Sequence, residues 1–247
     1  MKLKLTVEYD GTRYVGWQVQ QNGPSVQAAL EAALARIAGA PVDTIAAGRT
    51  DAGVHAAGQV VSFTPPREVP LKAWRLGVNS ILPDDVAVVA AEEVDDAFDA
   101  RRSASGKRYR YRLWNGGTRS PLRARTAWEV FRPLDVGAMR EASAQLVGAH
   151  DFSAFRAAGC DARTTVRKVR ACALSGASGD EIILEIEATA FLRHMVRNVV
   201  GTLVEVGHGK RSAGSVGDVL RSRDRALAGP TAPPHGLCLV EVSYGRR

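Results

Sequence analysis

The sequence predicts an α+β protein made of two ferredoxin-like halves, with a central antiparallel sheet and a cleft between the halves. Strand-type alternation, helical spacing and the order β-α-β-β-α-β in the first half predict this class. The chain has 247 residues, of which 45% are hydrophobic, enough for two domains of ordinary size. We expect an N-terminal domain over residues 1–105 and a C-terminal domain over 106–247.

The first half begins with a strand, because residues 2–9 alternate apolar and polar side chains before Asp10-Gly11 ends the pattern. Ser25 can cap a helix that runs at helical spacing to Gly39. The remaining expected elements are strands at 42–47 and 59–64, a helix at 71–82 and a strand at 86–94. Residues 48–56 are therefore expected to form a loop between two strands.

The second half shows the same two periodicities. The expected strands are 107–114, 126–131, 167–174, 181–189 and 237–242, and the expected helices are 135–147 and 191–206. Glycine, serine and proline recur in 211–234, which predicts an irregular surface region.

Composition limits the function classes. The chain has 33 basic and 26 acidic residues, a net charge of +7, which favours a polyanionic partner such as nucleic acid but also fits an acidic protein. Three cysteines without a C-x-x-C pair suggest neither a disulfide framework nor a zinc finger. The immediate first strand and the lack of a long apolar run predict a soluble cytoplasmic protein without signal peptide or membrane span.

Positive charge is concentrated in residues 101–125, which contain nine basic residues and no acid. Within it, Tyr109 and Tyr111 fall on one face of a predicted strand. The basic residues of that strand are Lys107, Arg108, Arg110 and Arg112. Aromatic rings can stack on unpaired bases while guanidinium groups neutralise phosphates, as in proteins that hold looped RNA. A strand with a buried aromatic face and a solvated basic face explains the pattern equally well.

The 48–56 loop carries one carboxylate, Asp51, two residues after Arg49 and two before Gly53. A nearby guanidinium would keep a nucleophilic carboxylate ionised, and a glycine would let a substrate approach closely. An aspartate that caps a turn and pairs with Arg49 is the alternative, and on local grounds the commoner one.

Arg197 lies on the predicted helix 191–206, whose other face is apolar, and both a site role and a surface role fit it. The histidines lack metal-ligand spacing, and the acids between 84 and 99 resemble a solvated edge. We expect no metal, because no ligand motif is present, and no small-molecule cofactor, because neither a dinucleotide fingerprint nor a Walker lysine occurs.

Eight motifs occur in the order found in the tRNA pseudouridine synthase A family, which the sequence resembles nearly from end to end. They are EYDG at 8–11, YVGWQ at 14–18, SVQ at 25–27, GRTDAGVHA at 48–56, GVN at 77–79, KRYRY at 107–111, HDFSAF at 150–155 and HMVRN at 194–198. The nine-residue motif at 48–56 is the most specific. Two features depart from the family pattern: loop 19–24 lacks a basic residue, and Arg193 stands where histidine is common.

The resemblance implies a homodimeric, cofactor-free enzyme that isomerises uridines 38, 39 and 40 in the anticodon arm of tRNA. It implies that Asp51 is the nucleophile, that Arg49 helps to flip the base, that Tyr109 stacks on the uracil and that Arg197 pairs with Asp51. Flipping frees the uracil to detach through N1 and reattach through C5. Asp51 would add to the base at C6 or assist at the sugar, and both routes stay open.

Two other functions remain as alternatives. A non-catalytic RNA-binding protein would keep the basic aromatic strand without needing Asp51. A metal-dependent nuclease would use the acids between 84 and 99.

Overall fold

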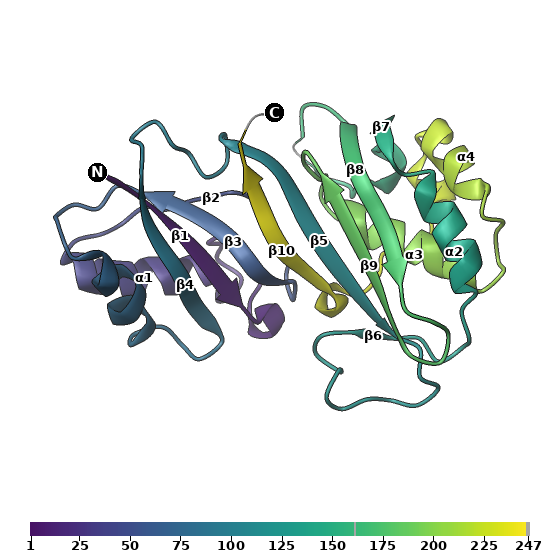
Figure 1. Ribbon diagram of the computed structural model, residues 1–247, viewed down its shortest axis with the longest axis horizontal. Helices are drawn as coiled ribbons and strands as arrows, with labels where there is room; N and C mark the ends of the chain where they lie inside the picture. The colour runs from purple at the N-terminus through teal and green to yellow at the C-terminus, as the bar shows by residue number, and fades with distance from the viewer. Residues whose placement is uncertain (161, 246–247) are drawn as a thin grey trace. The chain divides into compact units, whose positions relative to one another are not determined.

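The computed structural model describes residues 1–160 and 162–245 and is mixed α+β, as predicted (Figure 1). It divides into two compact units, which we describe separately. Unit 1 contains Met1–Ser105 and Cys238–Arg247, and unit 2 contains Gly106–Leu237. The expected C-terminal domain of 106–247 therefore needs correction, because the last strand packs with unit 1.

Unit 1 is a sheet with the strand order β4-β1-β3-β10, in which β2 also pairs with β3. Its elements are β1 (Lys2–Tyr9), η1 (Gly11–Arg13), α1 (Val26–Ala38), β2 (Ile45–Ala46), β3 (His55–Phe63), the π-helical η2 (Ala73–Gly77), β4 (Val86–Val94) and β10 (Leu237–Tyr244). Strand β1 is antiparallel to both of its neighbours, whereas β10 is parallel to β3. The prediction of a central antiparallel sheet is thus wrong for the β3–β10 pair, because these strands are joined by a long crossover connection, which allows parallel pairing, and not by a hairpin.

Local sequence explains these elements. The alternation in β1 fully buries Leu3, Leu5 and Val7 in the core. The Ser25 side chain accepts a hydrogen bond from the amide of Ala28 at 3.2 Å and so caps α1. Two expected elements are shorter than predicted: the strand at 42–47 is reduced to β2, and the helix at 71–82 centres on η2.

Unit 2 is a sheet with the order β5-β9-β8-β7, and β6 pairs in parallel with β5. Its elements are most of β5 (Ala104–Trp114), β6 (Trp128–Glu129), α2 (Val136–Ala144), β7 (Gly148–Asp151), η3 (Ser153–Phe155), β8 (Val166–Ser175), β9 (Glu181–Ala188), α3 (Met195–Gly207), α4 (Ser215–Ser222), η4 (Arg225–Leu227) and η5 (Pro234–Gly236). Helices α2, α3 and α4 lie together beside β8 and β9 (Figure 1). Antiparallel pairing aligns Tyr109 of β5 with Ile186 of β9.

Two expectations for unit 2 were wrong. Residues 211–234 contain helix α4, because Val216, Val219 and Leu220 are buried on one helical face despite the glycines around them. The long helix starts at Met195 instead of 191. Strand β7 had no predicted counterpart. No helix in the described residues has the length and hydropathy needed to cross a membrane.

Candidate active site

Asp51 lies in the loop between β2 and β3 of unit 1, where its side chain is half-buried, and Arg49 is exposed on the same loop. The chain reverses directly after the carboxylate: the amide of Val54 donates to the carbonyl of Asp51 at 3.1 Å. Gly53 supplies the left-handed backbone of this turn, with φ 74°. Its amide donates to the carbonyl of Tyr14 at 3.2 Å. The turn is thus tied to another segment of the chain.

That other segment, residues 14–17, holds the loop by its backbone. Gly16 forms an isolated antiparallel bridge with Asp51, and the amide of Trp17 donates to the carbonyl of Thr50 at 3.1 Å. A Cβ atom on Gly16 would lie 2.6 Å from the Thr50 carbonyl oxygen, so only glycine permits this approach. The backbone on either side of the Asp51 carboxylate is therefore fixed.

A buried polar cluster beneath the loop adds side-chain support. The hydroxyls of Tyr9 and Thr50 lie 2.8 Å apart, and Nε2 of Gln59 donates to the carbonyl of Gly48 at 2.7 Å. Burial raises the pKa of Tyr9 well above its ordinary value, so its hydroxyl stays protonated. The sequence alone did not reveal these supporting contacts, because the pairing of β1 with β3, and not sequence proximity, brings Tyr9 close to the loop that contains Thr50.

The acidic stretch between 84 and 99 contributes to the same support. Asp85 accepts hydrogen bonds from Nε of Arg13 and from the hydroxyl of Tyr14, both at 2.7 Å. Asp85 thereby anchors the segment that holds the Asp51 loop. Among residues 1–160 and 162–245 there is no group of three or more His, Cys, Asp or Glu side chains placed to hold a metal ion.

In unit 2, Tyr109 is largely buried on β5, with 8% of its surface exposed. Its ring meets that of Phe191 edge to face, with centroids 5.0 Å apart. Tyr111 and Leu113 follow on the same face and are fully or almost fully buried. The aromatic face of β5 is thus a packed face of unit 2.

The opposite face of β5 is partly exposed and carries Arg108, Arg110 and Arg112, three of the four basic residues predicted to contact RNA. The fourth, Lys107, is half-buried and precedes Tyr109 on the aromatic face. Arg110 donates twice to one carboxylate oxygen of Glu185 on β9, at 2.9 and 2.7 Å. Arg108 lies opposite Glu187 in the register, and Arg112 lies opposite Ile183. Acidic partners on β9 thus offset part of the charge on this face.

Arg197 is on α3, where its backbone and side chain both bind Ala232. Its Nε donates to the carbonyl of Ala232 at 2.7 Å, and the Ala232 amide donates to the carbonyl of Arg197 at 3.1 Å. The hydroxyl of Tyr111 donates to the next carbonyl, that of Pro233, at 2.8 Å. Burial raises the pKa of Tyr111, and the charge of Arg197 opposes that shift. The structure thus places two predicted site residues, Arg49 and Asp51, in unit 1 and two in unit 2.

A single carboxylate on a tightly held loop, together with a strand that pairs aromatic and basic faces, fits the class of RNA-modification enzymes. The family model described as tRNA pseudouridine synthase matches residues 5–101 and 142–245. The chain belongs to the tRNA pseudouridine synthase family. Its reaction is accordingly the isomerisation of uridine in tRNA. This result excludes the two alternative functions, a non-catalytic RNA-binding protein and a metal-dependent nuclease.

Similar proteins cover almost the whole chain. The tRNA pseudouridine synthase A of Myxococcus xanthus is 62% identical over 243 residues, which is 98% of this chain and 92% of that protein. The enzyme of the same name from Syntrophotalea carbinolica is 50% identical and covers 98% of this chain and 96% of its own length. A solved archaeal box H/ACA Nop10–Cbf5 complex aligns at 12% identity over 92% of this chain and 60% of that chain. The TM-score of that alignment is 0.39.

Proposed function

We propose that the enzyme isomerises uridines 38, 39 and 40 in the anticodon arm of tRNA, with Asp51 as the nucleophile. The observation that carries the proposal is the GRTDAGVHA loop, because it presents one carboxylate on a backbone held by residues 14–17. A nucleophile gains from such fixation, since its approach to the substrate then costs little conformational entropy.

The other site residues have distinct roles in the proposal. Arg49, exposed beside Asp51, helps to flip the target base and fills its place in the stack. Tyr109 stacks on the uracil, and its packing against Phe191 fixes the plane of its ring. Arg197 is the counter-ion that pairs with the Asp51 carboxylate. Lys107, Arg108, Arg110 and Arg112 contact the RNA backbone, with Arg110 the weakest contributor because Glu185 already binds it.

The reaction needs no redox step. The bond from ribose C1′ to N1 breaks, the ring rotates, a bond from C1′ to C5 forms, and the proton on C5 leaves while N1 gains one. Asp51 assists the first step by bonding to the base at C6 or to the sugar, and is released in the last. The proposal includes no metal and no small-molecule cofactor.

We further propose that the enzyme is a cytoplasmic homodimer and that its units are ferredoxin-like. In unit 1 the strand order β4-β1-β3-β2, with antiparallel neighbours, supports this class. In unit 2 the support is a mainly antiparallel sheet lined by α2 and α3. Its strand order, β5-β9-β8-β7, differs from that of unit 1. Mass measurement in solution by light scattering tests the dimer, and a monomeric mass would contradict it.

The function is tested with unmodified tRNA in the presence of EDTA, by mapping pseudouridine at single-nucleotide resolution. We expect signal at positions 38 to 40 with the wild type. Asp51→Asn should bind tRNA normally but form pseudouridine on the order of a thousandfold more slowly or not at all. Asp43→Asn, at an exposed aspartate near the same loop, is the matched control and should be fully active. Normal activity of Asp51→Asn would rule out Asp51 as the nucleophile. Pseudouridine at other tRNA positions instead of 38 to 40 would rule out the proposed target positions.

A further inference from the structure

Residues 225–232, which we call the strap, lie in unusually close contact with α3. A Cβ atom added to Gly201 of α3 would lie 1.7 Å from the carbonyl oxygen of Pro230 in the strap. The amide of Gly229 donates to the hydroxyl of Thr202 at 2.8 Å. The backbones of helix and strap therefore touch without intervening side chains.

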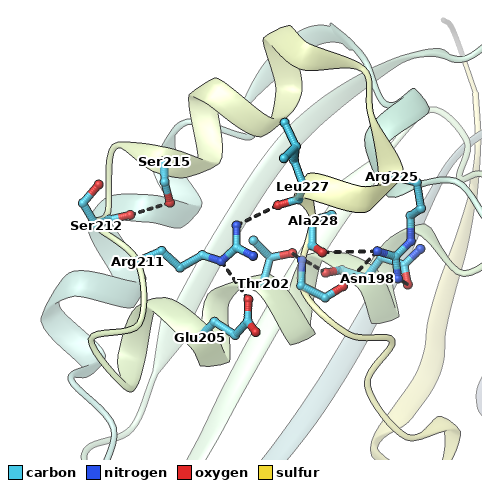
Figure 2. Close-up of polar contacts among 10 residues, drawn as sticks. Asn198, Thr202, Glu205, Arg211, Ser212, Ser215, Arg225, Leu227 and Ala228 are labelled. Carbon is cyan, nitrogen blue, oxygen red and sulfur yellow. Dashed lines mark hydrogen bonds and ion pairs between the residues drawn. The ribbon is translucent and has the colours of Figure 1, made fainter.

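Arg225, the first residue of the strap, stabilises the conformation of the strap through its side chain. Its Nη1 donates to the carbonyls of Gly229 at 3.0 Å and Ala228 at 3.3 Å. Its Nη2 donates to Oδ1 of Asn198 and to the hydroxyl oxygen of Thr231, both at 3.2 Å. Figure 2 shows the guanidinium of Arg225 beside Asn198 and the Ala228 carbonyl. Such forked contacts need the planar guanidinium, because an ammonium group donates from a single point.

Asn198 joins the strap to the interior of unit 2. Its side chain is fully buried, and Nδ2 donates to the carbonyl of Phe155 at 2.8 Å. Its Oδ1 accepts from the Thr231 hydroxyl at 2.7 Å and from Arg225. The amide orientation is thus set on both sides, and the strap has a fixed point one residue before Ala232.

Ala232 is the strap residue that binds Arg197. We propose that Arg225 is a positioning residue for the reaction: by fixing the strap through Asn198 and Thr231, it places the Ala232 carbonyl that orients the Arg197 side chain. The inference rests on the proposed role of Arg197. An arginine side chain has several rotatable bonds, so a carbonyl at 2.7 Å from Nε restricts where its terminal nitrogens lie.

Arg211 provides a matched control within the same structure. Its Nε donates to Glu205 of α3 at 2.7 Å, and its Nη1 donates to the carbonyl of Leu227 at 2.7 Å (Figure 2). Arg211 thus also fastens the strap to α3, but five residues before Ala232. Loss of Arg211 should weaken the fold of the strap without moving the Ala232 carbonyl.

The test compares Arg225→Met with Arg211→Met in pseudouridine formation on full-length unmodified tRNA, together with thermal unfolding. We expect both variants to lower Tm. Arg225→Met should lower kcat about tenfold with KM nearly unchanged, whereas Arg211→Met should change kcat less than about twofold. Thr231→Val removes a single hydroxyl from the same cluster and should lower kcat about threefold, which keeps the test available if Arg225→Met does not fold.

A double variant separates positioning from general damage. In the Arg197→Lys background, Arg225→Met should lower kcat by less than about twofold, because lysine has no Nε for Ala232 to hold. Equal kcat losses in Arg225→Met and Arg211→Met would overturn the inference, as would a full additional loss in the double variant. If Arg197→Lys loses activity while Arg225→Met and Thr231→Val keep a normal kcat, the positioning role of Arg225 is overturned but the proposed function is not. Normal kcat in Arg197→Lys would overturn the role of Arg197, and the inference with it.

Discussion

At the scale of single residues, the reactive group proposed for this enzyme depends on neighbours that do no chemistry. Thr50, next to Asp51, is bound through its hydroxyl by Tyr9 and through its carbonyl by Trp17. Because Thr50 and Tyr9 are buried, loss of either partner leaves a polar group without its hydrogen bond and without water. Stability and catalysis should therefore be coupled at this point.

Tyr9→Phe tests that coupling. We expect the free energy of unfolding to fall by about 1–3 kcal/mol and kcat to fall about tenfold, because the residue beside Asp51 loses its side-chain anchor. Urea unfolding and pseudouridine formation are the measurements. The control is Tyr244→Phe, which removes the hydrogen bond to the Ala100 carbonyl elsewhere in unit 1. It should lower stability but leave kcat unchanged, and a similar kcat loss in both variants would contradict the prediction.

His208 predicts a pH dependence of stability. Burial lowers its pKa, and the charges of Arg132 and Lys210 lower it further. Its Nε2 has no hydrogen-bond partner among the described residues. The unfolded chain therefore binds a proton at this residue more readily than the folded one. The resulting stability is present above the ordinary histidine pKa of about 6.5 and is lost as pH falls below it.

We expect the unfolding free energy, measured in urea between pH 7.5 and 5.5, to fall less steeply in His208→Gln than in the wild type. The other histidines are present in both proteins, so the difference reports His208 alone. Identical slopes would show that His208 titrates alike in the folded and unfolded chains.

At the scale of helices and strands, the elements with a clear periodic pattern could be predicted from the sequence, and those without one could not. Strand β1 and helix α1 were predicted within a residue or so, because their burial follows one clear period and Ser25 and Gly39 mark the helix ends. Helix α4 was missed because it is short and surrounded by glycines. Its buried positions became apparent only with the tertiary structure.

The site shows the same division. The Asp51 loop, Tyr109 and Arg197 were predicted as site residues from motif resemblance, since local sequence left each of them ambiguous. The supporting contacts were not predicted, although Tyr9, Thr50 and Asn198 lie in the motifs, because these contacts join distant positions. The β1–β3 pairing places Tyr9 beside Ala56 and so near the loop that contains Thr50, and the fold of the strap brings Arg225 to Asn198.

The close contact of α3 and the strap gives a prediction for the element itself. Gly201→Ala should lower Tm by several degrees, because the strap backbone would have to move away from the added methyl group. Gly214→Ala is the control: Gly214 precedes α4 with ordinary φ −61°, and a Cβ atom added there would have no other atom within 4 Å. A Gly201→Ala protein as stable as Gly214→Ala would contradict the close packing.

At the scale of the whole molecule, the positive charge is unevenly spread. The acid-free basic segment 101–125 continues beyond β5 into a loop where Arg119 and Arg125 are exposed. Arg123 in the same loop stacks on Trp114, with the guanidinium carbon 4.3 Å from the ring centroid. An ordered loop with exposed guanidinium groups suits contact with phosphates of the tRNA backbone.

Arg119→Ala with Arg125→Ala should therefore weaken tRNA binding and leave kcat unchanged. The slope of log affinity against log salt should become shallower by about 2, one unit for each phosphate that is no longer neutralised. Filter binding over a salt series measures both. Arg36→Ala with Arg75→Ala removes the same charge from exposed positions of unit 1 and should alter the slope little. Equal slopes in the two double variants would assign the effect to net charge alone.

The parallel pairing of β10 with β3 has a consequence for synthesis. Cys238 and Leu239 align with His55 and Ala56, so the sheet of unit 1 is completed by a segment that follows all of unit 2 in the chain. On the ribosome, unit 2 can finish folding while this edge of β3 still has unpaired backbone groups. An open strand edge invites pairing with other chains. The nascent protein should therefore be most prone to aggregation just before its last strand emerges.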